Sequence, residues 1–225
     1  MSGLRRGDSR VEDLAEGGVA SSIDWRPLQN FSGPSPALLW ATVPHETQLS
    51  ETDGQRIPGL GVISARYAEN AARKERDVLL ASKVFWDVFR RSKFVILFDR
   101  HSDRKLLHRL RDELEPGRAR SLQTLVLFAG KDDKAYCKPL AKNIQDVLAK
   151  GSSPLKFHYF DGMMSNKSPY PHDRFAVTDG EFWHFGGSVG GVELCLTAVS
   201  RGWKAKDVGV EDFVKTIWAT AAQWE

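Results

Sequence analysis

Apolar and polar residues follow one another along this chain in patterns that predict helices and strands in turn. Two continuous apolar runs, KFVILFD at 93–99 and LQTLVLFAG at 122–130, have the length of strands that are buried on both faces. Around these runs, apolar residues recur at three- and four-residue steps, which is typical of amphipathic helices. The helices predicted on this basis span 64–91, 102–117, 138–151 and 207–224.

Further strands are predicted over 37–43, 155–162, 173–180 and 181–187. The last two are joined by Asp179-Gly180, a dipeptide that is typical of two-residue hairpins. Helices that alternate with strands predict an α/β fold with helices on both faces of the sheet, and the hairpin makes that sheet mixed. We therefore expect a three-layer α/β/α sandwich with a mixed β-sheet. In the helix over 138–151, we expect the buried face to carry Leu140, Ile144, Val147 and Leu148.

The N-terminal residues 1–36 differ in composition from the rest, because they are rich in Gly, Ser, Asp and Pro. We interpret them as a mobile or loosely packed extension of one domain over 37–225. Trp25 and Phe31 are candidates to attach this extension to the domain or to a second protein chain.

Composition narrows the class of protein. The 225 residues are 41% hydrophobic and 27% charged, which is ordinary for a soluble globular protein. No apolar run is long enough to span a bilayer, and MSGLRRGDSRVEDLAEGG at the start lacks the apolar stretch of a secretory signal. Cys137 and Cys195 both lie in apolar stretches, so we expect them to be buried free thiols. Free thiols are typical of a reducing compartment, so we expect a cytoplasmic protein. The net charge of +3 permits an anionic partner without requiring one.

The segment PHDRFAVTDGEFWHFGGSVGG at 171–191 holds the most informative polar residues. Side chains alternate along an extended segment, so we expect His172 and Arg174 to point the same way, about 7 Å apart. Arginine offers a planar fork of donors to phosphate, and histidine can attack phosphorus or move a proton near neutral pH. The glycines before Ser188 let the backbone approach an anion. This pattern favours a phosphate-handling site; the alternative is a hairpin with a surface histidine, a surface arginine and a turn aspartate.

His172, Arg174, Asp179 and Gly186 follow the spacing His-x-Arg-x4-Asp-x6-Gly. This arrangement resembles the HKD motif of the phospholipase D superfamily, His-x-Lys-x4-Asp-x6-Gly-Ser. The predicted order of elements also resembles one half of the α/β/α sandwich of that superfamily. The resemblance covers roughly the last 160 residues of the chain.

The resemblance implies a metal-independent phosphodiesterase that needs no cofactor and works through a phosphohistidine intermediate. It implies catalytic roles for His172, Arg174 and Asp179, and substrate phosphate contacts from Arg174, Gly187 and Ser188. Family enzymes use one histidine to attack and another to protonate the leaving group. The other histidines of this chain belong to no second motif, so the resemblance implies a homodimer whose copies share one site. Nucleic acid is the first phosphodiester substrate that we expect, because the chain is mildly basic and has no lipid-facing helix.

The chain departs from the family pattern in three respects. Arg174 replaces the usual lysine, Gly187 occupies the usual place of the serine with Ser188 one step later, and the asparagine that often follows is absent. Arginine keeps the charge but presents a planar fork instead of a compact ammonium. These departures favour an alternative function, in which a weak or inactive phospholipase D-like subunit binds phosphate or nucleic acid, or assembles with other protein subunits through residues 1–36.

Some other polar residues near the predicted strands are candidates for site chemistry. Asp99, His101 and Asp103 occupy alternate positions after a strand and offer ligands to a divalent metal. The strand end and the cap of the next helix explain both aspartates equally well, and we expect no metal. His184 and Glu193 are candidates to border the site in a second layer. The alternatives are a packed or edge histidine and a solvated glutamate at a helix start.

Two pairs of residues are candidates for contacts with partners. Lys131 and Lys134 follow a predicted strand and could contact a polyanion, although a solvated loop explains them as well. Trp218 and Trp224 in the last predicted helix are candidates for a dimer contact, because aromatic side chains often anchor interfaces.

Overall fold

The computed structural model describes residues 23–40, 47–48, 80–99, 104–115, 118–129, 134–150, 155–160, 173–191 and 198–221. The strands are β1 (Ala37–Trp40), β2 (Thr47–Gln48), β3 (Phe94–Asp99), β4 (Thr124–Ala129), β5 (Lys156–Phe160), β6 (Arg174–Thr178), β7 (Glu181–Phe185) and β8 (Ala198–Lys204). The helices are α4 (Leu80–Phe89), α5 (Arg104–Glu113), α6 (Lys134–Lys150) and α7 (Val210–Ala221), with the short 3-10 turns η1 (Arg26–Leu28) and η2 (Val189–Gly191).

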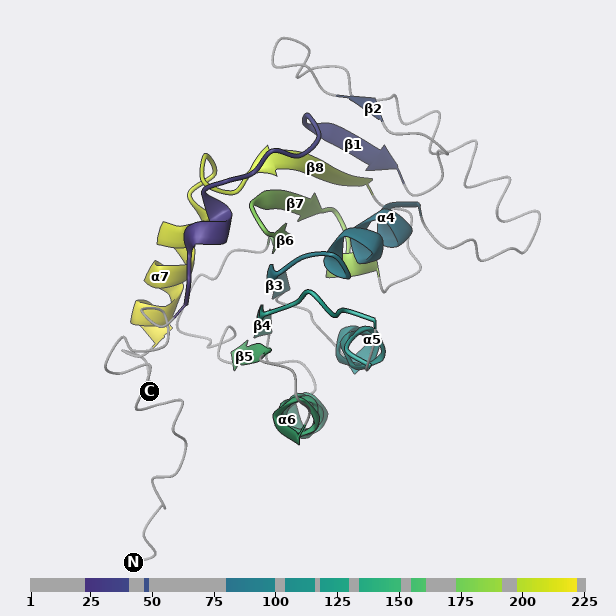
Figure 1. The fold of residues 1–225 in the computed structure, drawn as a ribbon, viewed down its shortest axis with the longest axis vertical. Helices are drawn as coiled ribbons and strands as arrows, with labels where there is room; N and C mark the ends of the chain where they lie inside the picture. The colour runs from purple at the N-terminus through teal and green to yellow at the C-terminus, as the bar shows by residue number, and fades with distance from the viewer. Residues whose placement is uncertain are drawn as a thin grey trace, which may run out of the picture.

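These strands form one mixed sheet, in the order β2-β1-β8-β7-β6-β3-β4-β5 (Figure 1). Strands β3, β4 and β5 run parallel to one another. Strand β6 is antiparallel to β3, and β6, β7 and β8 pair antiparallel in sequence order. The predicted α/β class with a mixed sheet is therefore confirmed, and so is the hairpin at Asp179-Gly180.

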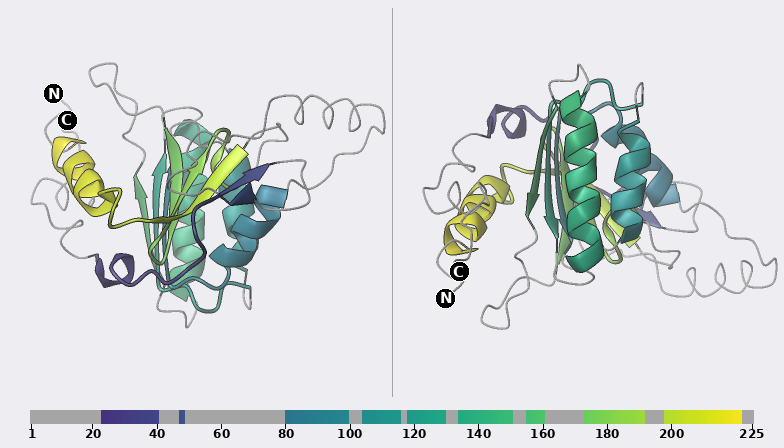
Figure 2. Two further views of the ribbon diagram at one scale, coloured as in Figure 1. Left: turned by 90° about the horizontal axis from the view of Figure 1, so that it is seen from above. Right: turned by 90° about the horizontal axis from the view of Figure 1, so that it is seen from below.

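Strand β3 lies inside the sheet and is buried along its whole length, as its unbroken apolar run predicts. Val95 and Leu97 belong to the core on one face, while Phe94, Ile96 and Phe98 belong to the core on the other. Helices α4, α5 and α6 lie against the first face, and α7 and η1 lie against the second (Figures 1 and 2). Within the described residues, no helix is long and apolar enough to cross a membrane.

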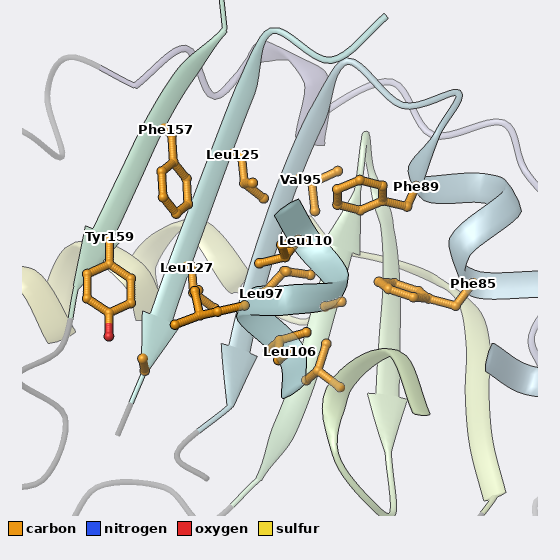
Figure 3. Close-up of a cluster of buried hydrophobic side chains, with 14 of the residues drawn as sticks. Phe85, Phe89, Val95, Leu97, Leu106, Leu110, Leu125, Leu127, Phe157 and Tyr159 are labelled. Atoms are coloured by element: carbon orange, nitrogen blue, oxygen red, sulfur yellow. The ribbon is translucent and has the colours of Figure 1, made fainter. Parts of the chain in front are cut away.

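The core under α4 and α5 is dense in aromatic and leucine side chains (Figure 3). Phe85 and Phe89 from α4 and Leu106 and Leu110 from α5 are four residues apart within their helices, so each pair lies on one helical face. These faces lie over Val95 and Leu97 of β3, and the same cluster also contains side chains of β4, β5 and α6, namely Leu125, Leu127, Phe157, Tyr159, Cys137, Ala141 and Ile144. The apolar period of the sequence thus decides how these helices pack on the sheet.

Part of the segment before β1 packs on the domain, and Trp25 is one of the residues that attach it, as the sequence suggested. Ile23 and Leu28 are buried in the core on the α7 side of the sheet. The Trp25 ring packs against Phe94, with ring centroids 6.1 Å apart. A Cβ atom added at Gly180 would lie 2.9 Å from Cβ of Phe31, so this segment also covers the hairpin turn closely. A few apolar anchors outweigh the Gly- and Pro-rich composition around them; residues 1–22 lie outside the described part of the chain.

Strand β8 and the inner face of α6 also differ from the prediction. Strand β8 carries Arg201, which is buried because its guanidinium pairs with Glu181 at 2.7 Å and lies 4.2 Å from the Trp183 ring centroid. A buried charge of this kind hides the strand from an analysis of apolar pattern. Helix α6 begins one turn earlier than predicted, which adds Cys137 to its buried side chains, and Ala141 is buried beside the expected Ile144. Val147 lies off the face that carries Cys137, Ala141 and Ile144, and it is 56% exposed, contrary to the prediction.

Leu28→Ala tests whether the segment before β1 belongs to the core. Leu28 is 1% exposed, so truncating its side chain should lower the free energy of unfolding by about 2–5 kcal/mol. Val208→Ala is the matched control, because Val208 is 47% exposed and its truncation should cost less than about 0.5 kcal/mol. Urea denaturation followed by circular dichroism measures both values. Equal effects of the two substitutions would show that the segment is only loosely attached.

Candidate functional site

One edge of the sheet brings together the polar residues that suit phosphate chemistry. Asp99 is the last residue of β3, and Arg174 is the first residue of the antiparallel neighbour β6. Because Phe98 pairs with Phe175 in the register, Asp99 and Arg174 meet at the same edge. The glycine-rich turn over 186–191 leaves β7 there as well. We call this place the Asp99 edge.

The Asp99 carboxylate connects the two other parts of this edge. Its Oδ1 atom lies 3.5 Å from Nε of Arg174. Its Oδ2 atom accepts a hydrogen bond of 2.9 Å from the backbone amide of Val189. The Asp99 side chain is fully buried, whereas that of Arg174 is 19% exposed and within reach of solvent. The buried carboxylate therefore forms an ion pair with Arg174, whose Nε atom is buried without a hydrogen bond, and it hydrogen-bonds the glycine-rich turn.

The glycine-rich turn is also fixed from the side of α4. The carbonyl oxygen of Gly190 accepts hydrogen bonds of 2.8 Å from Oγ of Ser82 and from the indole Nε1 of Trp86. Gly190 has a φ of 72°, and a Cβ atom there would lie 2.5 Å from the Trp86 ring. Only glycine suits both the left-handed backbone and the close contact.

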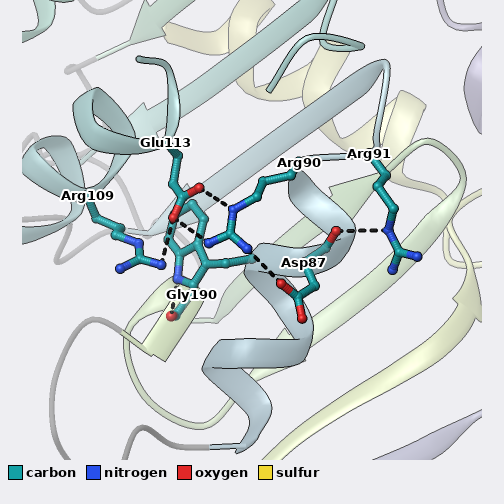
Figure 4. A network of polar contacts seen from close by, with 7 residues as sticks. Asp87, Arg90, Arg91, Arg109, Glu113 and Gly190 are labelled. Atoms are coloured by element: carbon teal, nitrogen blue, oxygen red, sulfur yellow. Dashed lines mark hydrogen bonds and ion pairs between the residues drawn. The ribbon is translucent and has the colours of Figure 1, made fainter. Parts of the chain in front are cut away.

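Trp86 is held in turn by a network of charges between α4 and α5 (Figure 4). The Arg109 guanidinium lies 5.1 Å from the Trp86 ring centroid and 2.7 Å from the carboxylate of Glu113. Glu113 is fully buried and also accepts hydrogen bonds of 2.6 and 2.9 Å from Arg90. The hydrogen bonds to Glu113 raise the pKa of Arg90 above its ordinary value, so Arg90 stays charged and the network stays neutralised. The network fixes the position of Trp86, and Trp86 fixes the turn.

The other residues expected at the site are either outside the described part of the chain or differ in how exposed they are. His172 and Glu193 lie outside the described residues. Gly186 is exposed, whereas Gly187 is buried and Ser188 is only 4% exposed. The Ser188 hydroxyl expected to contact a substrate phosphate is thus mostly covered in the single chain.

Asp179 lies at the opposite end of β6 from Arg174. Five residues of strand separate them, which is about 16 Å. Its Oδ1 atom accepts hydrogen bonds of 2.8 and 2.9 Å from the backbone amides of Lys93 and Phe94. Asp179 also has a φ of 49°, as a hairpin turn requires. Its position corrects the expected catalytic placement, because this carboxylate ties the hairpin to the start of β3.

His184 lies on the other face of the sheet from Arg174. It pairs with Phe175 in the β6–β7 register, whereas Arg174 pairs with Phe185. Its Nε2 atom is 3.5 Å from the carboxylate of Asp173, and both side chains are exposed. The expected position of His184 in a second layer of the site is therefore not what the structure shows. The two-residue turn at Asp179-Gly180 already implies this register, so the sequence alone indicates that His184 and Arg174 lie on opposite faces.

The sequence pattern alone does not indicate that Asp99 contacts Arg174 and the glycine-rich turn. The sequence offers Asp99 as a strand end or as a metal ligand with His101 and Asp103, and these two residues lie outside the described residues. Its position directly after an entirely buried strand was the available signal, since a charge there needs a partner. Lys131 and Trp224 are also outside the described part, and the side chains of Lys134 and Trp218 are not described.

Comparisons with known proteins identify no family for this chain, and they find a distantly similar solved structure. Neither a family profile nor a curated protein matches the chain. Among solved structures, the chain is similar to TrmBL2, an archaeal chromatin protein whose structure is described as showing a novel mode of DNA binding. The two are 11% identical with a TM-score of 0.37, over 80% of this chain and 74% of that one. A likeness at this level carries no argument about the function of the chain.

Asp179→Ala should lower the free energy of unfolding by about 1–3 kcal/mol, because two backbone amides lose their acceptor. Asp179→Asn keeps a side-chain oxygen and tolerates a positive φ, so it should cost less than the alanine variant. Asp173→Ala, at a side chain that is 73% exposed, is the neutral control. Urea denaturation measures all three. If Asp179→Ala unfolds like the wild type but loses phosphodiesterase activity, Asp179 acts in the site and the structural role is refuted.

Proposed function

We propose that this chain is a metal-independent phosphodiesterase, with nucleic acid as its substrate, that works as a homodimer through a phosphohistidine at His172. The observation that carries this proposal is the position of Arg174 at the Asp99 edge. Its guanidinium is oriented by a buried carboxylate and remains within reach of solvent. An arginine held in this way suits the recognition of a phosphate group.

The arrangement of helices and strands supports a phospholipase D-like fold. Helices lie against both faces of a mixed sheet, as a three-layer α/β/α sandwich requires. Arg174 begins β6, the strand next to β3, and the glycine-rich turn after β7 returns to the same edge. This is consistent with the resemblance that the spacing of His172, Arg174 and Gly186 suggests.

In the proposed reaction, Arg174 binds the nonbridging oxygens of the phosphodiester and stabilises charge that develops on them. A ring nitrogen of His172 attacks phosphorus, so that a nitrogen–phosphorus bond forms as the bond to the leaving oxygen breaks. The His172 of the second copy gives its proton to that leaving oxygen. The same histidine then takes a proton from water, which attacks phosphorus and releases His172. Neither step uses a metal ion.

A second candidate is a phosphate-binding or assembly subunit with weak or no catalysis. Two observations favour it: Arg174 already forms an ion pair with Asp99, and Ser188 is mostly covered. In that case the same edge binds phosphate without turnover. Activity therefore separates the two candidates.

His172→Ala should abolish cleavage of DNA, RNA and bis(p-nitrophenyl) phosphate while the fold stays intact, because the nucleophile is removed. Arg174→Ala should lower kcat by about 100- to 1000-fold, the usual effect of removing one transition-state donor. Arg174→Lys is its matched control and should retain more activity, since it keeps the charge. All assays contain excess EDTA, in which the wild type should stay active. Near-wild-type turnover by His172→Ala, or loss of wild-type activity in EDTA that added metal restores, would refute the mechanism.

The proposed site also requires two copies of the chain. One His172 cannot act at once as nucleophile and as the acid for the leaving group, so we expect a stable dimer with the two His172 side chains facing each other. Light scattering at micromolar concentration measures the mass in solution. A protein that is active but monomeric would contradict the shared site.

A further inference from the structure

An exposed aromatic ring lies among cationic side chains at the start of two helices. Tyr136, in the first turn of α6, is 42% exposed. The Arg104 guanidinium, at the first residue of α5, lies 5.8 Å from the centre of the Tyr136 ring. Nε2 of His108 lies 3.0 Å from the Tyr136 hydroxyl oxygen, within hydrogen-bond distance. We call Arg104, His108 and Tyr136 the Tyr136 cluster.

This cluster holds an aromatic face in a defined orientation at the surface. The hydrogen bond to His108 fixes the hydroxyl end of the ring, and Arg104 lies over the ring. A ring that is already oriented loses little conformational entropy when a flat ligand stacks on it. Unpaired nucleobases are such ligands, and they stack on aromatic side chains and on guanidinium planes.

In both α5 and α6, the basic residues lie mainly in the first half, near the cluster, and the acidic residues lie in the second half. Within α5, the acidic residues are Asp112 and Glu113 in the last turn, and within α6 the acidic residue is Asp146 in the second half. The first halves of both helices are basic, with exposed side chains at Lys105, Lys138 and Lys142 in addition to Arg104. Asp103, Asp132 and Asp133 directly precede the two helices in the sequence and offset part of this positive charge. The basic side chains within the helices attract a polyanion.

The cluster belongs to helices that begin at the same end of the sheet as the site proposed above. Helices α5 and α6 follow β3 and β4, so both begin at the edge where those parallel strands end, which is the Asp99 edge. Both helices cover the sheet face toward which Arg174 points, because Arg174 pairs with Phe185 of that core. Strands β6 and β4 are separated by β3 alone, which is about 10 Å across the sheet. A polymer held by one phosphate at Arg174 can therefore extend over Tyr136, whereas a small phosphodiester cannot.

We infer that the Tyr136 cluster binds a nucleotide of single-stranded nucleic acid, with the base stacked on Tyr136 and the backbone facing the cations. The inference rests on the proposed function, because it takes Arg174 as the place of the scissile phosphate. It adds the class of substrate: a single strand, whose unpaired bases are free to stack, and not a duplex.

Tyr136→Ala tests the inference, with Val147→Ala as the matched control. Val147 is an exposed apolar residue of the same helix, distant from the cluster. Fluorescence anisotropy with labelled oligothymidylate should show Kd rising about 5- to 150-fold for Tyr136→Ala, the usual effect of losing one stacked base. Tyr136→Phe keeps the ring face and should bind far more tightly than the alanine variant. Val147→Ala should bind like the wild type.

Different outcomes separate this inference from the proposed catalysis. Turnover of bis(p-nitrophenyl) phosphate should be unchanged in Tyr136→Ala, while KM for oligothymidylate rises. If the wild type cleaves no phosphodiester but Tyr136→Ala still weakens oligothymidylate binding, the catalysis is refuted and the binding surface stands. Binding by Tyr136→Ala equal to that of Val147→Ala would overturn the inference. Equal weakening toward duplex DNA and heparin would also overturn it, because stacking would then not be the cause.

Discussion

The buried Asp99 carboxylate is the interaction on which the edge of this sheet depends. A charge removed from water needs partners, and Asp99 obtains them from the Arg174 side chain and the Val189 amide. One side chain thereby joins the end of β3, the start of β6 and the turn after β7. The hydrogen bonds from Ser82 and Trp86 to Gly190 hold that turn from α4. The position of Arg174 is therefore set by the core and not by a surface loop.

Much of the fold could be predicted from the apolar pattern, because β3, β4 and the helices around them bury long, regular apolar faces. The pattern failed where burial depends on a specific partner. Strand β8 contains the buried Arg201, which Glu181 and Trp183 stabilise, and no periodicity reveals such a pairing. The segment before β1 is composed like a linker, yet Leu28 and Ile23 fill space on the sheet. Contacts between residues distant in sequence decided both cases.

The candidate site could be predicted only in part, because motif spacing counts residues and does not say which end of a strand each one occupies. Arg174 lies at the Asp99 edge, whereas Asp179 lies at the far end of the same strand and binds backbone amides there. The partner of Arg174 is Asp99, far away in sequence and next to it in the sheet. Hairpin register, by contrast, was available from the two-residue turn and would have placed His184 on the opposite face.

In the proposed site, Arg174 lies against Asp99 and receives a phosphate group at this edge. Diffraction from crystals containing tungstate, a heavy phosphate analogue, tests the claim most directly, because its anomalous signal locates the bound ion. Tungstate should lie within hydrogen-bond distance of the Arg174 guanidinium, with the contacts of Asp99 to Arg174 and Val189 preserved. Tungstate bound elsewhere, with Arg174 engaged by Asp99 alone, would contradict it.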